Sequence, residues 1–129
     1  MKKIVVLLLF VISTSVFAEW TAVGTSSDGM TLYGDYGTIK RKGNKVKMWR
    51  LYDFKTFQKG ENVKYLSMVT RDEYDCEEET SQMLDVYWYS SNMKSGEVVF
   101  SDSNIRVEPK SIVPRSVNET LFNIACDKK

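Results

Sequence analysis

Two cysteines and one acidic segment are the parts of this chain whose residue types and spacing could support chemistry. Cys76 lies in RDEYDCEEET, and Cys126 lies in NIACDKK. Carboxylates so close to a thiol oppose formation of the thiolate, which makes Cys76 a poor nucleophile at neutral pH. The carboxylates of this segment are Asp72, Glu73, Asp75, Glu77, Glu78 and Glu79.

The composition excludes most catalytic and metal-binding arrangements. The chain has no histidine, so a Cys-His pair and a Ser-His-Asp triad are both impossible. A structural zinc site takes four Cys or His ligands, whereas two cysteines are present. The acidic segment also lacks the alternating ligands and central glycine of a calcium-binding loop. Acid–base catalysis by two carboxylates is the remaining option, but consecutive acids at a strand end are usually only solvated. We therefore expect no catalytic residue, no metal and no cofactor.

The first residues, MKKIVVLLLFVISTSVFAEW, have the layout of a bacterial export signal. Lys2 and Lys3 precede an apolar run at residues 4–12, and Val16 and Ala18 place small residues before a cleavage site. The run is too short to cross a bilayer as a helix. We expect cleavage after Ala18, which leaves residues 19–129 as one domain without a transmembrane segment. No cysteine follows the run, so a lipid anchor is not expected, and the product is periplasmic, secreted or bound to the cell surface.

Export places Cys76 and Cys126 in an environment where disulfides form and persist. Two cysteines allow one intramolecular pairing, and we expect a disulfide between them. Two free thiols, or a bond between two chains, are the alternatives. The whole sequence has a formal net charge of +1 at pH 7. Such a balance disfavours a nucleic-acid partner, because binding to phosphates requires a strongly basic surface.

The first half of the mature chain is expected to form short strands separated by turn residues. Residues 20–25 are the first candidate, followed by the turn SSDG. Two short strands are then predicted at residues 31–33 and 37–40. The dipeptides at residues 34–35 (GD) and 43–44 (GN) are predicted to be turns.

The middle of the chain predicts longer strands. KVKMWRLYDF has apolar residues at both odd and even positions, which favours a central strand covered on both faces or a bulge near Trp49. KTFQKGEN is expected to be a polar loop. Residues 63–74 predict a long strand that ends at the acidic segment, and QMLDVYWYSS predicts its antiparallel partner. In that partner, we expect Leu84, Val86 and Trp88 on one face and Tyr87 and Tyr89 on the other.

A helix is predicted after Pro114. Ser116 and Glu119 have the spacing of a capping box, in which each side chain accepts a hydrogen bond from the other's backbone N–H. About ten residues are too few for a helix that stands alone in water, so this helix must dock on the sheet. The predicted fold is α+β, a twisted antiparallel sheet of about six strands with one C-terminal helix tethered to a face by the disulfide. The apolar stripe of the helix consists of Val117, Leu121, Ile124 and Ala125.

The order of these motifs resembles the surface-adhesin protein E domain family. The resemblance rests on KVKMWRLYDF, on the strand that ends in YDC, on VYWYSS and on the closing segment IVPRSVNETLFNIAC. It covers about residues 20–126, and its most specific part is the Pro-x-Ser-x-x-Glu spacing followed by Cys126. The resemblance implies a mostly six-stranded sheet whose concave face holds the C-terminal helix through a disulfide. It also implies an exported protein that binds host extracellular matrix or serum proteins.

An adhesin-like binding protein without catalytic activity is therefore the first functional hypothesis. Its candidate surface combines aromatic rings with a cation, because Tyr, Trp and Arg are enriched at binding hot spots. A soluble periplasmic protein that inhibits a hydrolase is the alternative, with KTFQKGEN or the acidic segment entering the enzyme cleft. Exposed edges of the sheet permit pairing into a homodimer. The residues of the candidate surface are Tyr65, Arg71, Tyr87, Trp88 and Tyr89.

Overall fold

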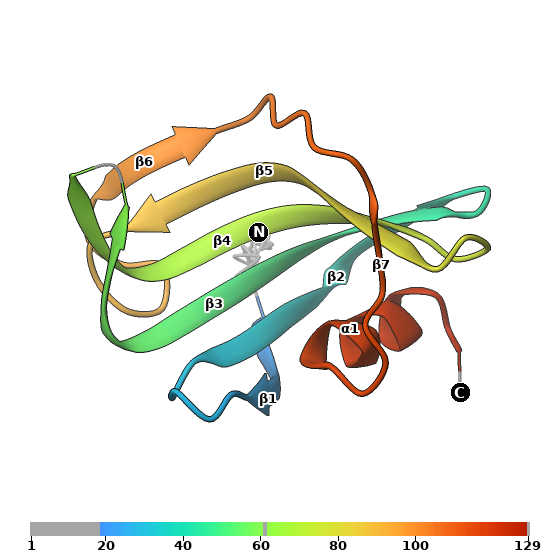
Figure 1. Cartoon of the computed structure of the whole chain (residues 1–129), viewed down its shortest axis with the longest axis horizontal. Helices are drawn as coiled ribbons and strands as arrows, with labels where there is room; N and C mark the ends of the chain where they lie inside the picture. Colours follow the sequence, from blue (N-terminus) through green and yellow to red (C-terminus); the bar gives the residue numbers. More distant parts are fainter. Residues whose placement is uncertain (1–18, 61, 129) are drawn as a thin grey trace, which may run out of the picture.

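The computed structural model describes residues 19–60 and 62–128. The predicted export signal at residues 1–18 lies outside this part of the chain, so its cleavage stays a prediction. Seven strands and one helix follow each other along the described residues (Figure 1). They are β1 (Thr21–Thr25), β2 (Thr31–Lys42), β3 (Lys45–Gly60), β4 (Val63–Asp75), β5 (Thr80–Tyr89), β6 (Val98–Asp102), β7 (Lys110–Ser111) and α1 (Val117–Ala125).

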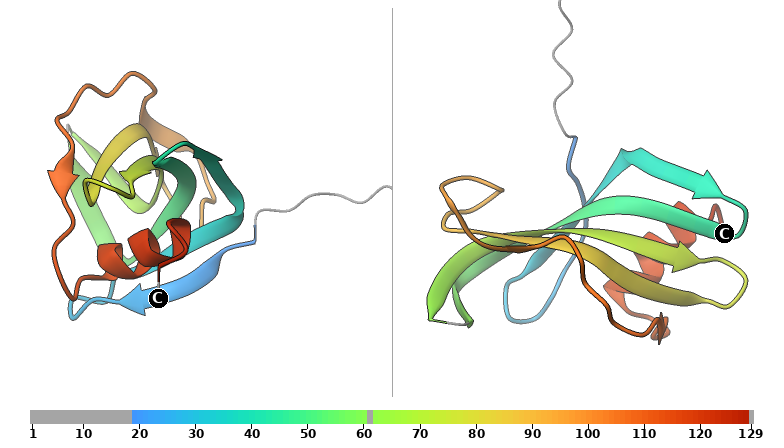
Figure 2. Two further views of the ribbon diagram at one scale, coloured as in Figure 1. Left: turned by 90° about the vertical axis from the view of Figure 1, so that its right-hand side faces the viewer. Right: turned by 90° about the horizontal axis from the view of Figure 1, so that it is seen from above.

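The strands form one antiparallel sheet in which neighbours in sequence are neighbours in space. The order is β1-β2-β3-β4-β5-β6, and the short β7 pairs with the start of β5, beyond the part that pairs with β6. The sheet is twisted, and α1 lies on the face toward which it curves (Figure 2). The predicted fold class is confirmed. We call the face that carries α1 the helix face and the opposite one the outer face.

Strand β3 is covered on both faces, as its pattern predicted. Val46 and Met48 are buried on the helix face, and Leu51 is fully buried on the outer face. The predicted bulge lies next to Trp49 but on the neighbouring strand, because the register between β2 and β3 shifts between Asp35 and Lys40. A second shift, in β4–β5, leaves Leu84 outside the regular alternation that was predicted for that strand.

Two predicted breaks in the strands are wrong. Strand β2 runs continuously through Gly34, where a turn was expected. This glycine is needed for packing, because a Cβ there would lie 2.9 Å from Cδ2 of Leu121 in the helix. The segment KTFQKGEN was expected to be a loop, but β3 continues to Gly60 within it. Residues 55–60 are therefore not the loop that was expected for one of the two segments named in the inhibitor hypothesis. The predicted turn at residues 43–44 is confirmed, and Gly43 has a φ of +62°.

The helix buries a stripe that overlaps the predicted one. Leu121 and Ala125 are buried in the core as expected, and Ile124 is only half-buried. Phe122, which the prediction missed, is buried and packs edge-on against the ring of Tyr74, with 5.9 Å between centroids.

Of the two reciprocal hydrogen bonds predicted for the capping box at the start of the helix, the structure contains one. The Ser116 hydroxyl accepts a hydrogen bond from the backbone N–H of Glu119 at 3.1 Å. The Glu119 carboxylate accepts one from Arg115 at 3.2 Å, one residue before the expected donor. The predicted helix start is therefore confirmed. The capping box is incomplete, because Glu119 bonds to the backbone N–H of Arg115 and not to that of Ser116.

A disulfide joins the end of the helix to the end of β4. Cys76 and Cys126 form a bond with an Sγ–Sγ distance of 2.08 Å, and both residues are buried. The backbone N–H of Cys76 also donates to the carbonyl of Asn44 in the β2–β3 turn, at 2.8 Å. The expected pairing is confirmed, so the acidic segment around Cys76 surrounds a structural crosslink.

A buried polar network joins the start of the helix to the sheet. Nη1 of Arg50 on β3 lies 3.2 Å from a carboxylate oxygen of Asp72, 3.0 Å from the Tyr74 hydroxyl and 2.9 Å from Oδ1 of Asn118 in α1. Burial raises the pKa of the Asp72 carboxyl, and the Arg50 guanidinium opposes that rise. Asn118 also donates to the Ser81 hydroxyl on β5 at 3.2 Å. The helix is thus held at both ends, by polar contacts at its start and by the disulfide at its end.

Removal of the disulfide will weaken the whole domain. The bond closes a loop between residues 50 positions apart, which the chain-entropy model values at about 4 kcal/mol. We expect the Cys76→Ala/Cys126→Ala variant to lose roughly this amount of unfolding free energy, measured by urea titration. Alkylation of both thiols in the exported protein without prior reductant would contradict the crosslink.

Removal of the carboxylate from the buried network will also be costly. Asp72→Ala leaves the buried Arg50 without its counter-ion, and we expect a loss of about 3–5 kcal/mol in urea unfolding. Replacement of both partners, Arg50→Met with Asp72→Leu, should cost less than the single change. The control is Lys45→Ala, which removes a more exposed ion pair to Glu73 and should cost less than about 1 kcal/mol. Equal losses for Asp72→Ala and Lys45→Ala would refute the role of the network.

Candidate functional site

The five residues predicted as one binding surface lie on two faces of the sheet. Tyr65 and Trp88 stack on each other, with 4.3 Å between ring centroids. Arg71, Tyr87 and Tyr89 occupy the outer face, where Tyr87 pairs with Val69 and Arg71 pairs with Asp85 in the β4–β5 ladder. The alternation of β5 explains why Tyr87 and Tyr89 lie on the face opposite Trp88, because successive side chains of a strand point to opposite faces.

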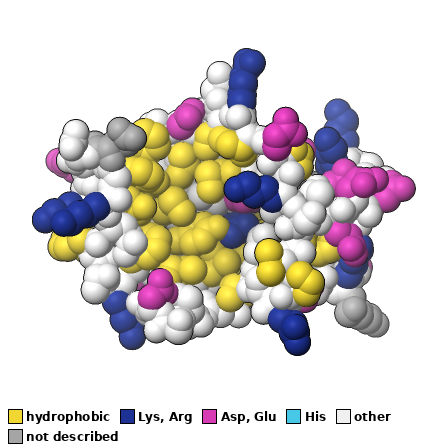
Figure 3. Space-filling model, in the orientation of Figure 1, with side chains coloured by type: hydrophobic (Ala, Val, Ile, Leu, Met, Phe, Trp, Pro, Cys, Tyr) yellow, Lys and Arg dark blue, Asp and Glu magenta, His cyan; other side chains and the backbone are white. Residues whose placement is uncertain are grey.

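The aromatic patch lies on the helix face, beyond the part of the sheet that α1 covers. Trp88 stacks between Tyr65 and Phe100, and its ring centroid is 4.4 Å from that of Phe100. Phe54 packs edge-on against Tyr65 at 5.8 Å. All are half-buried, and Figure 3 shows a broad hydrophobic area over this half of the molecule. We use the name aromatic patch for Phe54, Tyr65, Trp88 and Phe100.

The backbone at the end of β3 packs closely against the Trp88 ring. A Cβ at Gly60 would lie 2.6 Å from this ring, so the glycine allows the end of β3 to approach it closely. The indole N–H of Trp88 is buried and has no hydrogen-bond partner among the described residues. Burial raises the pKa of the Tyr65 hydroxyl. These rings are therefore held rigidly and partly desolvated, as expected for anchor residues of an interface.

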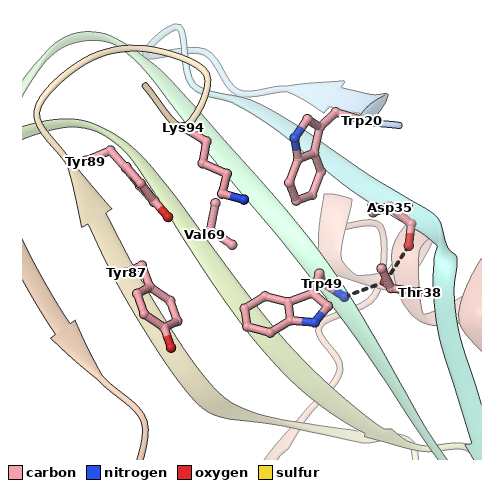
Figure 4. Close-up of a pocket in the computed structure, with 8 residues that line it drawn as sticks. All are labelled: Trp20, Asp35, Thr38, Trp49, Val69, Tyr87, Tyr89 and Lys94. Carbon is pink, nitrogen blue, oxygen red and sulfur yellow. Dashed lines mark hydrogen bonds between the residues drawn. The ribbon is translucent and has the colours of Figure 1, made fainter. Parts of the chain in front are cut away.

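A second site is an aromatic hollow on the outer face. It has a volume of about 320 Å³. Figure 4 shows four rings arranged around it, with the ammonium of Lys94 directed toward the same space and Val69 at its base. Burial raises the pKa of the Tyr89 hydroxyl, with a smaller contribution from Tyr87. The residues that line the aromatic hollow are Trp20, Asp35, Thr38, Trp49, Val69, Tyr87, Tyr89 and Lys94.

The irregular part of β2 shapes one wall of the aromatic hollow. Between Asp35 and Lys40 the register of β2 with β3 shifts. There the side chain of Thr38 forms hydrogen bonds with backbone groups of both strands. The Thr38 hydroxyl donates to the carbonyl of Asp35 at 2.6 Å and accepts the backbone N–H of Trp49 at 3.0 Å (Figure 4). The backbone donor of β3 is thereby satisfied although its strand partner has moved away.

A well-anchored loop brings Lys94 to the aromatic hollow. The loop between β5 and β6 has two non-glycine residues with positive φ, Met93 at +54° and Lys94 at +61°. The Asp53 carboxylate accepts the backbone N–H of Met93 at 2.8 Å, and the Ser67 hydroxyl accepts that of Lys94 at 3.0 Å. Backbone conformations of this kind persist only where the surroundings hold them. The position of Lys94 is therefore built into the fold.

Arg71 lies beside the hollow and faces the ring of Trp49. Its guanidinium carbon is 5.8 Å from the ring centroid, and its Nε pairs with the carboxylate of Asp85. The centroid of Tyr87 lies 6.2 Å from that of Trp49. The predicted Arg71, Tyr87 and Tyr89 are thus brought together. Trp20, Trp49 and Lys94 were missed because they come from segments whose proximity depends on strand pairing and on the loop conformation.

No metal centre is visible in residues 19–60 and 62–128, where no group of three or more His, Cys, Asp or Glu side chains could hold an ion. One carboxylate of the acidic segment forms hydrogen bonds within its own turn. The Asp75 carboxylate accepts the backbone N–H groups of Glu77 and Glu78 at 3.1 and 3.0 Å, which stabilises the β4–β5 turn. Within the same part of the chain, no helix is long and apolar enough to span a membrane.

Comparisons with known proteins agree with this architecture. Solved structures of Haemophilus influenzae protein E superpose with a TM-score of 0.62 at 12% identity, covering 88% of this chain and 88% of that one. A second crystal form gives 0.61 at 11% identity, with 88% and 91% covered. Protein E from non-typeable Haemophilus influenzae gives 0.54 at 14% identity, with 87% and 76% covered. A search of curated proteins gives no match. These likenesses establish the fold, and the model of the surface-adhesin protein E family matches residues 20–127. The chain therefore belongs to the surface-adhesin protein E family.

Proposed function

We propose that this protein is an exported binding protein without catalytic activity, which attaches to host extracellular matrix or serum proteins through the aromatic patch. The proposal rests on membership in an adhesin family and on one structural observation. That observation is the rigid stack of Tyr65, Trp88 and Phe100 on a part of the helix face that α1 leaves uncovered.

The patch has the chemistry of an interface core. Tyr and Trp rings bring large apolar area at a low entropic cost, and each ring here is fixed by its neighbour. Phe57, on the same end of β3 as Phe54, is 57% exposed and adds apolar surface nearby. Contiguous exposed apolar surface of this kind marks protein-binding sites in soluble domains.

The location and assembly of the protein are parts of the same proposal. A binding protein for host partners must reach the cell surface or the medium, which fits the export signal predicted at residues 1–18. The disulfide fits an oxidising compartment. Strands β1 and β6 are the outer strands of the open sheet, and pairing of such edges would produce the homodimer. Light scattering of the mature protein tests that assembly.

Substitutions in the aromatic patch will separate binding from folding. We expect Tyr65→Ala and Trp88→Ala each to weaken binding to an immobilised panel of purified host matrix and serum proteins at least tenfold, because anchor rings dominate such interfaces. Biolayer interferometry measures the affinities, and urea unfolding confirms that each variant is folded.

The matched control is Tyr87→Ala, which removes a ring from the adjacent position on the opposite face of β5. It should leave binding within about twofold of the unsubstituted protein. Binding that survives both patch substitutions in folded protein would refute the aromatic patch as the docking surface. Failure of the unsubstituted protein to bind any member of the panel would refute the proposed class of partner.

A further inference from the structure

A second, basic hollow lies next to the aromatic hollow on the outer face. The second hollow also has a volume of about 320 Å³. Both are lined by Thr38 and Trp49, so they lie on either side of these two residues. The second hollow adds Lys40, Lys47 and Arg71. The outer face therefore combines aromatic rings with four cations in two adjoining hollows, which we together call the depression.

The carboxylates nearest this depression already have partners. Asp85 pairs with Arg71, and Glu73 lies 3.7 Å from Nζ of Lys45. The buried Asp35 accepts the backbone N–H two residues further on at 3.2 Å. Glu73 lies directly opposite Lys47 in the β3–β4 ladder and offsets part of its charge. A backbone hydrogen bond does not cancel the charge of the Asp35 carboxylate, which lines the aromatic hollow beside Lys94.

Three lysines that line the two hollows have no ion pair with any described residue. Lys40 and Lys47 are direct cross-strand partners in the β2–β3 ladder. Like charges directly opposite each other destabilise a sheet, so an anion between them would relieve repulsion. Lys94 is the third, and its loop holds it at the other end of the depression. Cations in both hollows suit a ligand that carries several negative charges along its length.

The aromatic rings indicate which uncharged part such a ligand would have. Trp49 and Tyr87 are tilted by 42° to each other, and Trp20 and Tyr89 complete the wall. Faces of this kind pack against the C–H groups of a sugar ring, while tyrosine hydroxyls and the indole N–H donate hydrogen bonds to its hydroxyls. A recess of about 320 Å³ accommodates one or two such rings.

We propose that the outer face binds an anionic sugar chain, with a pyranose ring in the aromatic hollow and its sulfate or carboxylate groups on Lys40, Lys47 and Lys94. A single-stranded nucleic acid, whose bases also stack on aromatic rings, is one of the outcomes of the test below. A flat anionic membrane surface would not fill a recess lined by four rings. The proposal does not depend on the aromatic patch, because the two sites lie on opposite faces of the sheet.

The test is calorimetric titration of the mature protein with a heparin decasaccharide, a sulfated and carboxylated sugar chain, at near-physiological salt. We expect saturable binding that Lys40→Gln/Lys47→Gln weakens at least tenfold. Trp20→Ala should weaken it at least threefold, since it removes one wall of the aromatic hollow without changing the charge. Trp88→Ala should leave it unchanged, which separates this site from the aromatic patch.

The matched control is Lys59→Gln/Lys64→Gln, which removes another pair of directly opposed lysines, at the far end of β3 and β4. It should change the affinity less than twofold. Absence of heparin binding overturns the proposal, and so does an equal loss for the two lysine pairs. Binding of single-stranded DNA, polyglutamate or phosphatidylserine vesicles as tight as that of heparin, with no effect of Trp20→Ala, would show a general polyanion surface and overturns it too.

Discussion

The disulfide between Cys76 and Cys126 determines which parts of the sheet are available for binding. It fixes the end of α1 beside the end of β4, while Asn118 fixes the start of the helix to Arg50 and Ser81. A helix of nine residues held at both ends cannot slide along the sheet. It therefore covers one part of the helix face and leaves the aromatic patch uncovered at the other.

The outer face depends on a different constraint, the satisfaction of backbone hydrogen bonds where the ladder is interrupted. The bulge in β2 would leave the N–H of Trp49 without a partner, and the Thr38 hydroxyl supplies one. On the opposite side, Ser67 and Asp53 hold the loop that carries Lys94. Side chains that replace backbone partners at these two places leave room for a recess between regular strands.

Much of the fold could be predicted from the sequence because the signals are local. The strand-forming run at residues 63–74, the cap at Ser116 and the two cysteines each depend on few neighbouring residues. The turn expected at Gly34 was wrong because the glycine serves a tertiary contact with Leu121, which no local pattern records. The candidate site was harder to predict. Alternation correctly separates Tyr87 from Trp88, but the rings that contact each of them come from segments far away in the sequence, which no local pattern records.

The two faces suit different kinds of partner for physical reasons. The aromatic patch is apolar and preformed, so desolvation of its rings supplies the driving force, and salt should have little influence on its binding. The depression on the outer face has three unpaired lysines, so electrostatic attraction contributes there and weakens as salt screens it. Because the sheet is one layer thick, the side chains of β5 serve both faces in alternation. The ten residues of β5 thereby contribute rings to both proposed binding surfaces, Trp88 to one and Tyr87 and Tyr89 to the other.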